Sequence, residues 1–209
     1  DEHNRYIAPI HFLELAKKNK LYPQLTKIMI EKTFDKFRDS EYIVSINISV
    51  EDILNKDIHN FIIKKLATSE MGASVVFEII ESEGIENFDE VIKFINEVKS
   101  FNAKVSIDDF GTGYSSLSYL QNYPFSCVKI DRSFIDNLAE SYKSRELVHT
   151  IISMARNLNL SLVAEGVETK YQAEFVAKSG ANIWQGYYYG KPTDVDSFSQ
   201  KYLINLGEE

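Results

Sequence analysis

The hydrophobic pattern alternates between two kinds of segment along the chain. Short apolar runs rich in β-branched residues are separated by longer segments in which apolar positions recur at helical spacing. This alternation is typical of repeated βα units, so it predicts an α/β fold with a parallel sheet or barrel. Six strands are expected, at residues 42–48, 74–80, 104–108, 126–130, 161–165 and 182–187.

The segments between these strands have the period of amphipathic helices. Residues 87–101 place Val91, Ile95 and Val98 on one face, and the same spacing recurs over residues 144–158. Each of these helices is therefore expected to cover the sheet with its apolar side.

The chain is expected to open with two helices rather than with a strand. One follows Pro9 and the other runs from about Pro23 to Phe37. After the first strand, Ser49 and Asp52 have the spacing of a capping box, which predicts a helix start at that point.

Composition limits the function classes. A chain of 209 residues with 44% hydrophobic content can bury one sizeable core, and it shows no low-complexity linker, so one domain over residues 1–209 is expected. The net charge of -8 argues against a DNA or anionic-membrane surface. The single Cys127 excludes an internal disulfide and favours the cytoplasm. No apolar run reaches the roughly 20 residues of a membrane span, so no membrane contact is expected from this domain, although its parent protein could be anchored elsewhere.

Polar residues recur where the predicted apolar strands end. In parallel barrels this edge carries the active site. A charged group at the end of a buried strand is costly unless it has partners, so these side chains are expected to converge. They are Asn47, Glu78, Asp108, Asp109, Lys129, Glu165, Glu168 and Gln185.

The chemistry of this set indicates a divalent metal. Carboxylate and amide oxygens suit Mg²⁺ or Mn²⁺, whereas the sequence has no close cluster of His and Cys for zinc. Taken singly, each acid could equally be a helix cap or an ion-pair partner. The adjacent Asp108 and Asp109, followed by Gly111 and Gly113, favour the functional interpretation. Lys129 lies in an apolar run, where it can form a buried ion pair and also orient water or neutralise a phosphate.

Several motifs carry a family resemblance. They are INIS, FEIIES, SIDDFGTGYSSLSYL, VKIDRSFI, VAEGVET and QGYYYGKP, in this order. From about Pro9 to Pro192 the chain resembles the EAL domain family, bacterial phosphodiesterases that act on cyclic di-GMP. The resemblance implies a (β/α)8 TIM-like barrel that hydrolyses cyclic di-GMP to linear pGpG with two Mg²⁺ or Mn²⁺ ions.

The resemblance also implies a role for each matched residue. Lys129 is expected to contact the attacking water, with Gln185 in support, and Glu165 to act either as a metal ligand or as the general base. Glu81 and Glu168 are expected to order the loop of residues 110–116. The implied metal ligands are Asn47, Glu78, Asp108 and Asp109, whereas the motifs assign no further substrate-binding residues.

One part of the family pattern is missing from this sequence. The Glu-Ala-Leu signature and its strand should precede the segment around Pro9, and HFLELAKK is not that signature. The barrel is therefore expected to lack its first two strands, as an N-terminally truncated domain. We expect the parent protein to contain them, with a naturally short chain as the alternative. An upstream sensor or cyclase-like domain and a homodimer would fit the family habit.

Three other functions remain open at this stage. The chain could bind cyclic di-GMP without cleaving it, as a signalling module. The same acids and lysine would also suit a barrel enzyme that acts on an enolate. Finally, the two unpaired strand edges of an incomplete barrel could recruit a partner.

Overall fold

The structure is a computed structural model that describes residues 11–80, 88–112 and 116–203. Its internal contacts divide the chain into two compact units. The first comprises residues 1–77 and 85–103, and the second comprises residues 78–84 and 104–209. The division passes through strand β2, and the prediction of a single domain over residues 1–209 stays a prediction.

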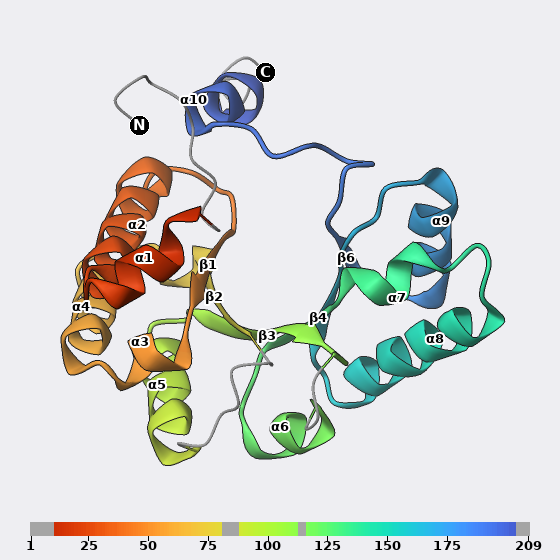
Figure 1. Ribbon diagram of the computed structural model, residues 1–209, viewed down its shortest axis with the longest axis horizontal. Helices are drawn as coiled ribbons and strands as arrows, with labels where there is room; N and C mark the ends of the chain where they lie inside the picture. The colour runs from red at the N-terminus through yellow and green to blue at the C-terminus, as the bar shows by residue number, and fades with distance from the viewer. Residues whose placement is uncertain (1–10, 81–87, 113–115, 204–209) are drawn as a thin grey trace. The chain divides into compact units, whose positions relative to one another are not determined.

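The first unit is mainly helical (Figure 1). Two helices precede its first strand, as predicted, and no strand precedes them among the described residues. Its elements are α1 (Leu13–Lys18), α2 (Tyr22–Phe37), β1 (Val44–Ile48), α3 (Val50–Leu54), α4 (Lys56–Ala67), the 3₁₀ turn η2 (Gly72–Ser74), the start of β2 (Val75–Ile80) and α5 (Phe88–Ser100).

The core of the first unit forms where α2 and α4 pack side by side. Ile30 and Phe34 of α2 are almost fully buried, as are Ile58, Ile62 and Leu66 of α4. In both helices these residues recur every four positions, which places them on one face. The apolar stripe in the sequence is thus the packed surface of each helix.

A polar cluster inside the first unit starts helix α3. The Ser49 hydroxyl accepts a hydrogen bond from the Asp52 amide at 3.1 Å, and the Asp52 carboxylate accepts from the Ser49 amide at 3.0 Å. Thr26 of α2 donates to the same carboxylate at 3.1 Å. The predicted capping box is confirmed, and it also ties α3 to α2.

The second unit alternates strands and helices. Its elements are β3 (Lys104–Phe110), α6 (Ser116–Asn122), β4 (Cys127–Ile130), α7 (Arg132–Asp136), α8 (Tyr142–Asn157), β5 (Ser161–Ala164), α9 (Lys170–Ser179), β6 (Ile183–Trp184), α10 (Val195–Phe198) and the π-helical turn η4 (Ser199–Leu203). Among the described residues of this unit, β3, β4, β5 and β6 pair in chain order and in parallel. The predicted α/β class is confirmed.

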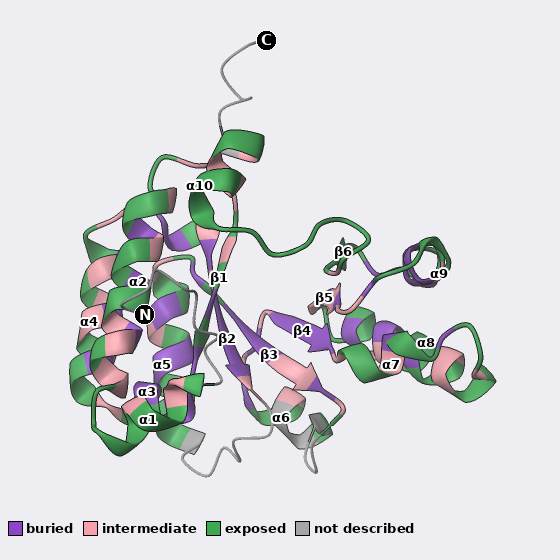
Figure 2. Cartoon of the chain, turned by 45° about the horizontal axis from the view of Figure 1, so that its top comes forward, coloured by how far each residue is buried: buried purple, intermediate pink, exposed green. Residues whose placement is uncertain are grey.

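Helices α8 and α9 share an apolar core with β4 and β5. Val148 and Ile152 of α8, Leu162 of β5 and Val176 of α9 belong to one buried apolar cluster. Strand β4 is buried along its whole length, as Figure 2 shows. This core fixes the strand ends at which the polar residues lie.

Some element boundaries differ from the sequence prediction. Helix α8 starts at Tyr142 rather than Ser144, because the hydroxyl of Ser141 caps it by accepting a hydrogen bond from the Ser144 amide. Strand β6 is shorter than predicted, because the chain turns after Trp184. None of the helices in the described ranges combines the length and the apolar composition that a membrane span requires.

Candidate metal centre at the carboxyl ends of the strands

A β-bulge places two consecutive aspartates at the same point of the sheet. The register between β3 and β4 shifts between Ile107 and Phe110, so Asp108 and Asp109 together lie opposite Lys129. Asp109 has a positive φ of 55°, a conformation that aspartate tolerates better than most residues. In a regular strand neighbouring side chains point to opposite faces, and the bulge removes that restriction.

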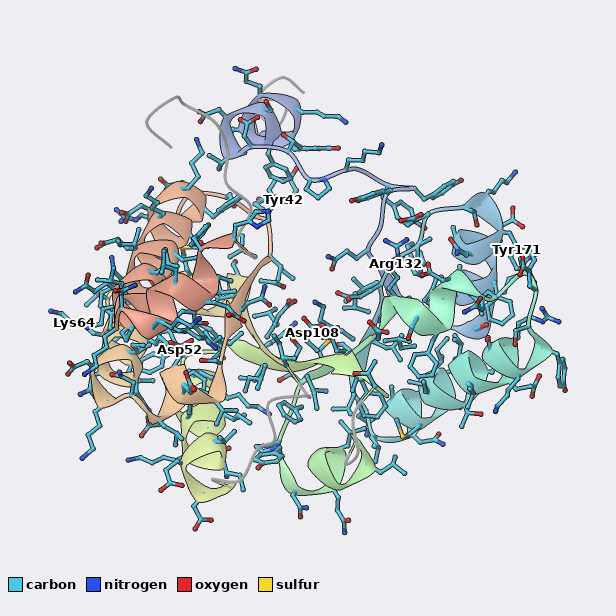
Figure 3. The ribbon with its side chains drawn as sticks, in the orientation of Figure 1. Tyr42, Asp52, Lys64, Asp108, Arg132 and Tyr171 are labelled. Carbon is cyan, nitrogen blue, oxygen red and sulfur yellow. The ribbon has the colours of Figure 1, made fainter. Side chains whose placement is uncertain are left out.

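Lys129 is the centre of a buried ion-pair cluster. Its Nζ lies 2.6 Å from Glu165 Oε1, 2.7 Å from Glu78 Oε2 and 3.1 Å from Asp108 Oδ1. The lysine side chain is only 5% exposed, and those of Glu78, Asp108 and Glu165 are 9%, 14% and 17% exposed. Four strands of the second unit thus bring these groups together, and the predicted buried ion pair of Lys129 is confirmed. Figure 3 labels Asp108 of this cluster.

The cluster shifts the pKa values of Lys129 and Glu165. Burial alone would lower the pKa of Lys129, but hydrogen bonds to Glu165 and Glu78 outweigh it, so its pKa is raised. Burial raises the pKa of Glu165, and the hydrogen bond from Lys129 opposes this effect. Lys129 therefore keeps its positive charge. Burial disfavours the ionised form of Glu165, and the hydrogen bond from Lys129 offsets part of that penalty.

The donor set fits a hard divalent cation. Asp108, Asp109 and Glu165 each offer a carboxylate oxygen, and these atoms lie within 4.8 Å of one another. Together with Glu78 they make four carboxylates against the single ammonium of Lys129, a formal excess of three negative charges. Since partly buried carboxylates repel each other in a medium of low polarity, a bound cation would stabilise this arrangement.

The turn after β5 carries a second predicted residue. Glu168 Oε1 lies 3.0 Å from an Nη of Arg132, and its amide donates to Gln172 Oε1 at 2.8 Å. The expected role of Glu168 in ordering the loop of residues 110–116 stays a prediction. Its expected partner Glu81 lies outside the described residues.

Two further predicted residues lie on strands or at their ends. Gln185 is exposed, and its main chain pairs with Ala164 and Val167 on either side of Glu165, through hydrogen bonds of 2.9 and 3.0 Å. Asn47 is exposed on β1 of the first unit. The roles proposed for both side chains stay predictions.

Sequence reasoning missed the short helix α7, which starts directly after β4. Five residues are too few to show a helical period. One signal was present, since Asp131 precedes the helix and its carboxylate accepts a hydrogen bond from the Ser133 amide at 3.0 Å.

The fold and this cluster define an α/β protein with parallel strands and a cluster of carboxylates at their carboxyl ends. The EAL domain family model matches residues 1–192. The chain therefore belongs to the EAL domain family.

The individual relatives agree with this assignment. The chain is 33% identical over 197 residues to the bifunctional diguanylate cyclase/cyclic di-GMP phosphodiesterase MucR of Pseudomonas aeruginosa, covering 91% of this chain and 29% of that protein. It is 32% identical over 204 residues to the cyclic di-GMP phosphodiesterase PdeR of Escherichia coli, covering 94% of this chain and 31% of that protein. The chain thus spans less than a third of the length of these curated relatives.

A solved structure shows the same fold. The structure of the PaMucR phosphodiesterase in complex with c-di-GMP matches with a TM-score of 0.83 and 32% sequence identity. The match covers 92% of this chain and 81% of that chain.

Proposed function

We propose that the protein hydrolyses cyclic di-GMP to linear pGpG in bacterial second-messenger signalling, with Mg²⁺ or Mn²⁺ as cofactor. The observation that carries the proposal is the Lys129 cluster, in which carboxylates from three strands converge on the buried ammonium that a fourth strand supplies. The names of MucR and PdeR, and the c-di-GMP complex of PaMucR, support the choice of substrate.

Each side chain of the cluster has a role in this proposal. Asp108 and Asp109 would hold the cations with Glu78 and Asn47, and Glu165 would either join them or accept a proton from water. Bound divalent cations would neutralise charge on the phosphodiester and make a coordinated water more acidic. Lys129 keeps its positive charge, so it would orient the attacking water and offset negative charge that develops on the phosphate.

The excess of carboxylates explains why cations are needed for this substrate. A phosphodiester carries a negative charge, which the acids of the cluster would repel. Lys129 cannot offset them alone, because it is one ammonium among four acids. With one or two divalent ions in place, the same cluster would attract the phosphate.

Turnover by the full-length protein tests the proposal. We expect cyclic di-GMP to disappear and pGpG to accumulate with Mn²⁺ or Mg²⁺ present, followed by chromatography and mass spectrometry, and to stay intact in EDTA. Tight binding of cyclic di-GMP without any pGpG would refute hydrolysis and favour a binding module. Failure to bind or cleave the dinucleotide would refute both.

A further inference from the structure

Helix α7 joins the three segments that carry the candidate site. It follows β4, the strand of Lys129, after a single intervening residue, Asp131. Its buried Ile135 belongs to the apolar core of the second unit, and Gln172 of α9 donates to the Ile135 carbonyl at 3.1 Å. The helix is therefore fixed on the scaffold.

One side chain of α7 lies against the turn that follows Asp109. A methyl group added at Gly111 would lie 2.9 Å from two ring carbons of Phe134, closer than carbon atoms approach without strain. Gly111 also has a positive φ of 98°. The turn is closed by Thr112, whose amide and hydroxyl donate to the Asp109 carbonyl at 3.2 and 2.8 Å. The Phe134 ring thus limits where the backbone after Asp109 can lie.

A second side chain of α7 lies against the turn that follows Glu165. A methyl group added at Gly166, whose φ is +69°, would lie 2.4 Å from Arg132 Cγ. The Arg132 guanidinium reaches Glu168 at 3.0 Å and both carboxylate oxygens of Asp136 at 3.1 to 3.2 Å. The arginine therefore holds this turn by packing along its stem and by an ion pair at its end. Arg132 is labelled in Figure 3.

We propose that Arg132 and Phe134 are positioning residues of the cation site. They hold the Asp109 turn and the Glu165 turn at the separation that brings both carboxylates within reach of one ion. The inference rests on the proposed function, because it concerns the same site. Neighbours that orient metal ligands typically change metal affinity or activity 10- to 100-fold when they are removed.

Phe134→Leu tests the first contact. Leucine keeps an apolar side chain on the core and loses the ring edge against Gly111. The matched control is Phe175→Leu, because Phe175 is another partly buried phenylalanine packed on the same core cluster. We expect faster amide hydrogen exchange over residues 109–112 and a dissociation constant for Mn²⁺ raised about tenfold in Phe134→Leu alone.

Arg132→Met tests the second contact. Methionine keeps much of the stem and loses the guanidinium. Arg145→Met is the control, since Arg145 bonds the Leu138 carbonyl at 2.8 Å and contacts neither turn in any described interaction. We expect faster exchange over residues 165–168 and weaker Mn²⁺ binding in Arg132→Met, with partial rescue in Arg132→Lys, which restores the charge without the planar fork.

Calorimetric Mn²⁺ titration, exchange and steady-state kinetics together decide the proposal. We expect kcat to fall about tenfold in both α7 variants, with a smaller change in KM and with melting temperatures like those of the controls. If exchange and Mn²⁺ affinity in the α7 variants match the controls, the positioning role is wrong. If the wild-type protein binds Mn²⁺ but cleaves no cyclic di-GMP, the hydrolase proposal fails, while exchange and Mn²⁺ affinity still decide the positioning role.

Discussion

The two units each bury an acidic side chain, and they satisfy it in opposite ways. Asp52 in the first unit is 1% exposed, and its carboxylate accepts hydrogen bonds from the Ser49 amide, the Ser49 hydroxyl and the Thr26 hydroxyl. In the second unit, several carboxylates share the single ammonium of Lys129. Neutral donors complete the first arrangement, whereas the second keeps an excess of negative charge.

This difference separates a structural acid from a candidate ligand. The partners of Asp52 come mainly from its own helix start, so a local motif accounts for its burial. The acids around Lys129 come from separate strands and repel each other, which no local motif requires. Buried acids that share too few donors and cations therefore indicate a cation site better than a buried acid, such as Asp52, that neutral donors satisfy.

The largest expected effect on stability comes from Lys129→Met. Removing one partner of a buried ion-pair cluster leaves uncompensated charge, so the free energy of unfolding should fall by roughly 3 kcal/mol. Turnover should fall at least about 10²-fold, because the charge near the phosphate is lost. Urea unfolding and the pGpG assay measure the two effects. Lys178→Met, which removes a lysine side chain that is 79% exposed, should change neither.

Glu165→Gln should separate activity from stability. Glutamine keeps an oxygen that can accept from Lys129, and burial already makes ionised Glu165 costly, so unfolding should change little. Turnover should fall roughly 10³-fold, because the amide of glutamine is neutral. It can neither accept a proton from water nor give a metal ion the charge of a carboxylate. Glu174→Gln on the surface of α9 serves as the control. Wild-type turnover in Glu165→Gln would show that Glu165 is neither a metal ligand nor the general base.

How much of this was predictable from sequence differs between the two clusters. The Ser49 and Asp52 capping box was readable because both residues belong to one short motif. The convergence of Asp108, Lys129 and Glu165 followed from the rule that parallel strand ends meet at one edge.

The bulge and helix α7 were not predictable in this way. A regular strand would point Asp108 and Asp109 to opposite faces, and only the register shift against β4 places both opposite Lys129. The contacts of Phe134 and Arg132 depend on tertiary packing against Gly111 and Gly166, which sequence spacing does not contain.

Asp52→Asn should give a moderate effect confined to stability. Asparagine has an NH2 group in place of one carboxylate oxygen, and this donor would face a group that now donates to Asp52. The lost hydrogen bond should lower the free energy of unfolding by about 2 kcal/mol. The dissociation constant for Mn²⁺ should stay at the wild-type value, because Asp52 contributes no ligand. A changed Mn²⁺ affinity would contradict the distinction between the two clusters.

The smallest expected effect concerns Cys127, which lies on β4 two residues before Lys129. Burial, and then the charge of Glu78, raise the pKa of its thiol to about 11. The folded chain holds the proton more tightly than the unfolded chain, so this contribution to stability is present below about pH 8.5 and is lost as pH rises toward 11. Unfolding at pH 9 should therefore show a loss below about 1 kcal/mol that Cys127→Ala lacks. Equal pH dependence in both proteins would contradict the raised pKa.

The most direct test of the central claim is the gain in unfolding free energy that Mn²⁺ produces. A ligand that binds only the folded chain stabilises it by about 2.7 kcal/mol at 100 times its dissociation constant. The proposed site predicts this gain in the wild-type protein and in Asp52→Asn, and almost none in Asp109→Asn at the same Mn²⁺ concentration. Equal gains in Asp52→Asn and Asp109→Asn would show that the cation binds elsewhere.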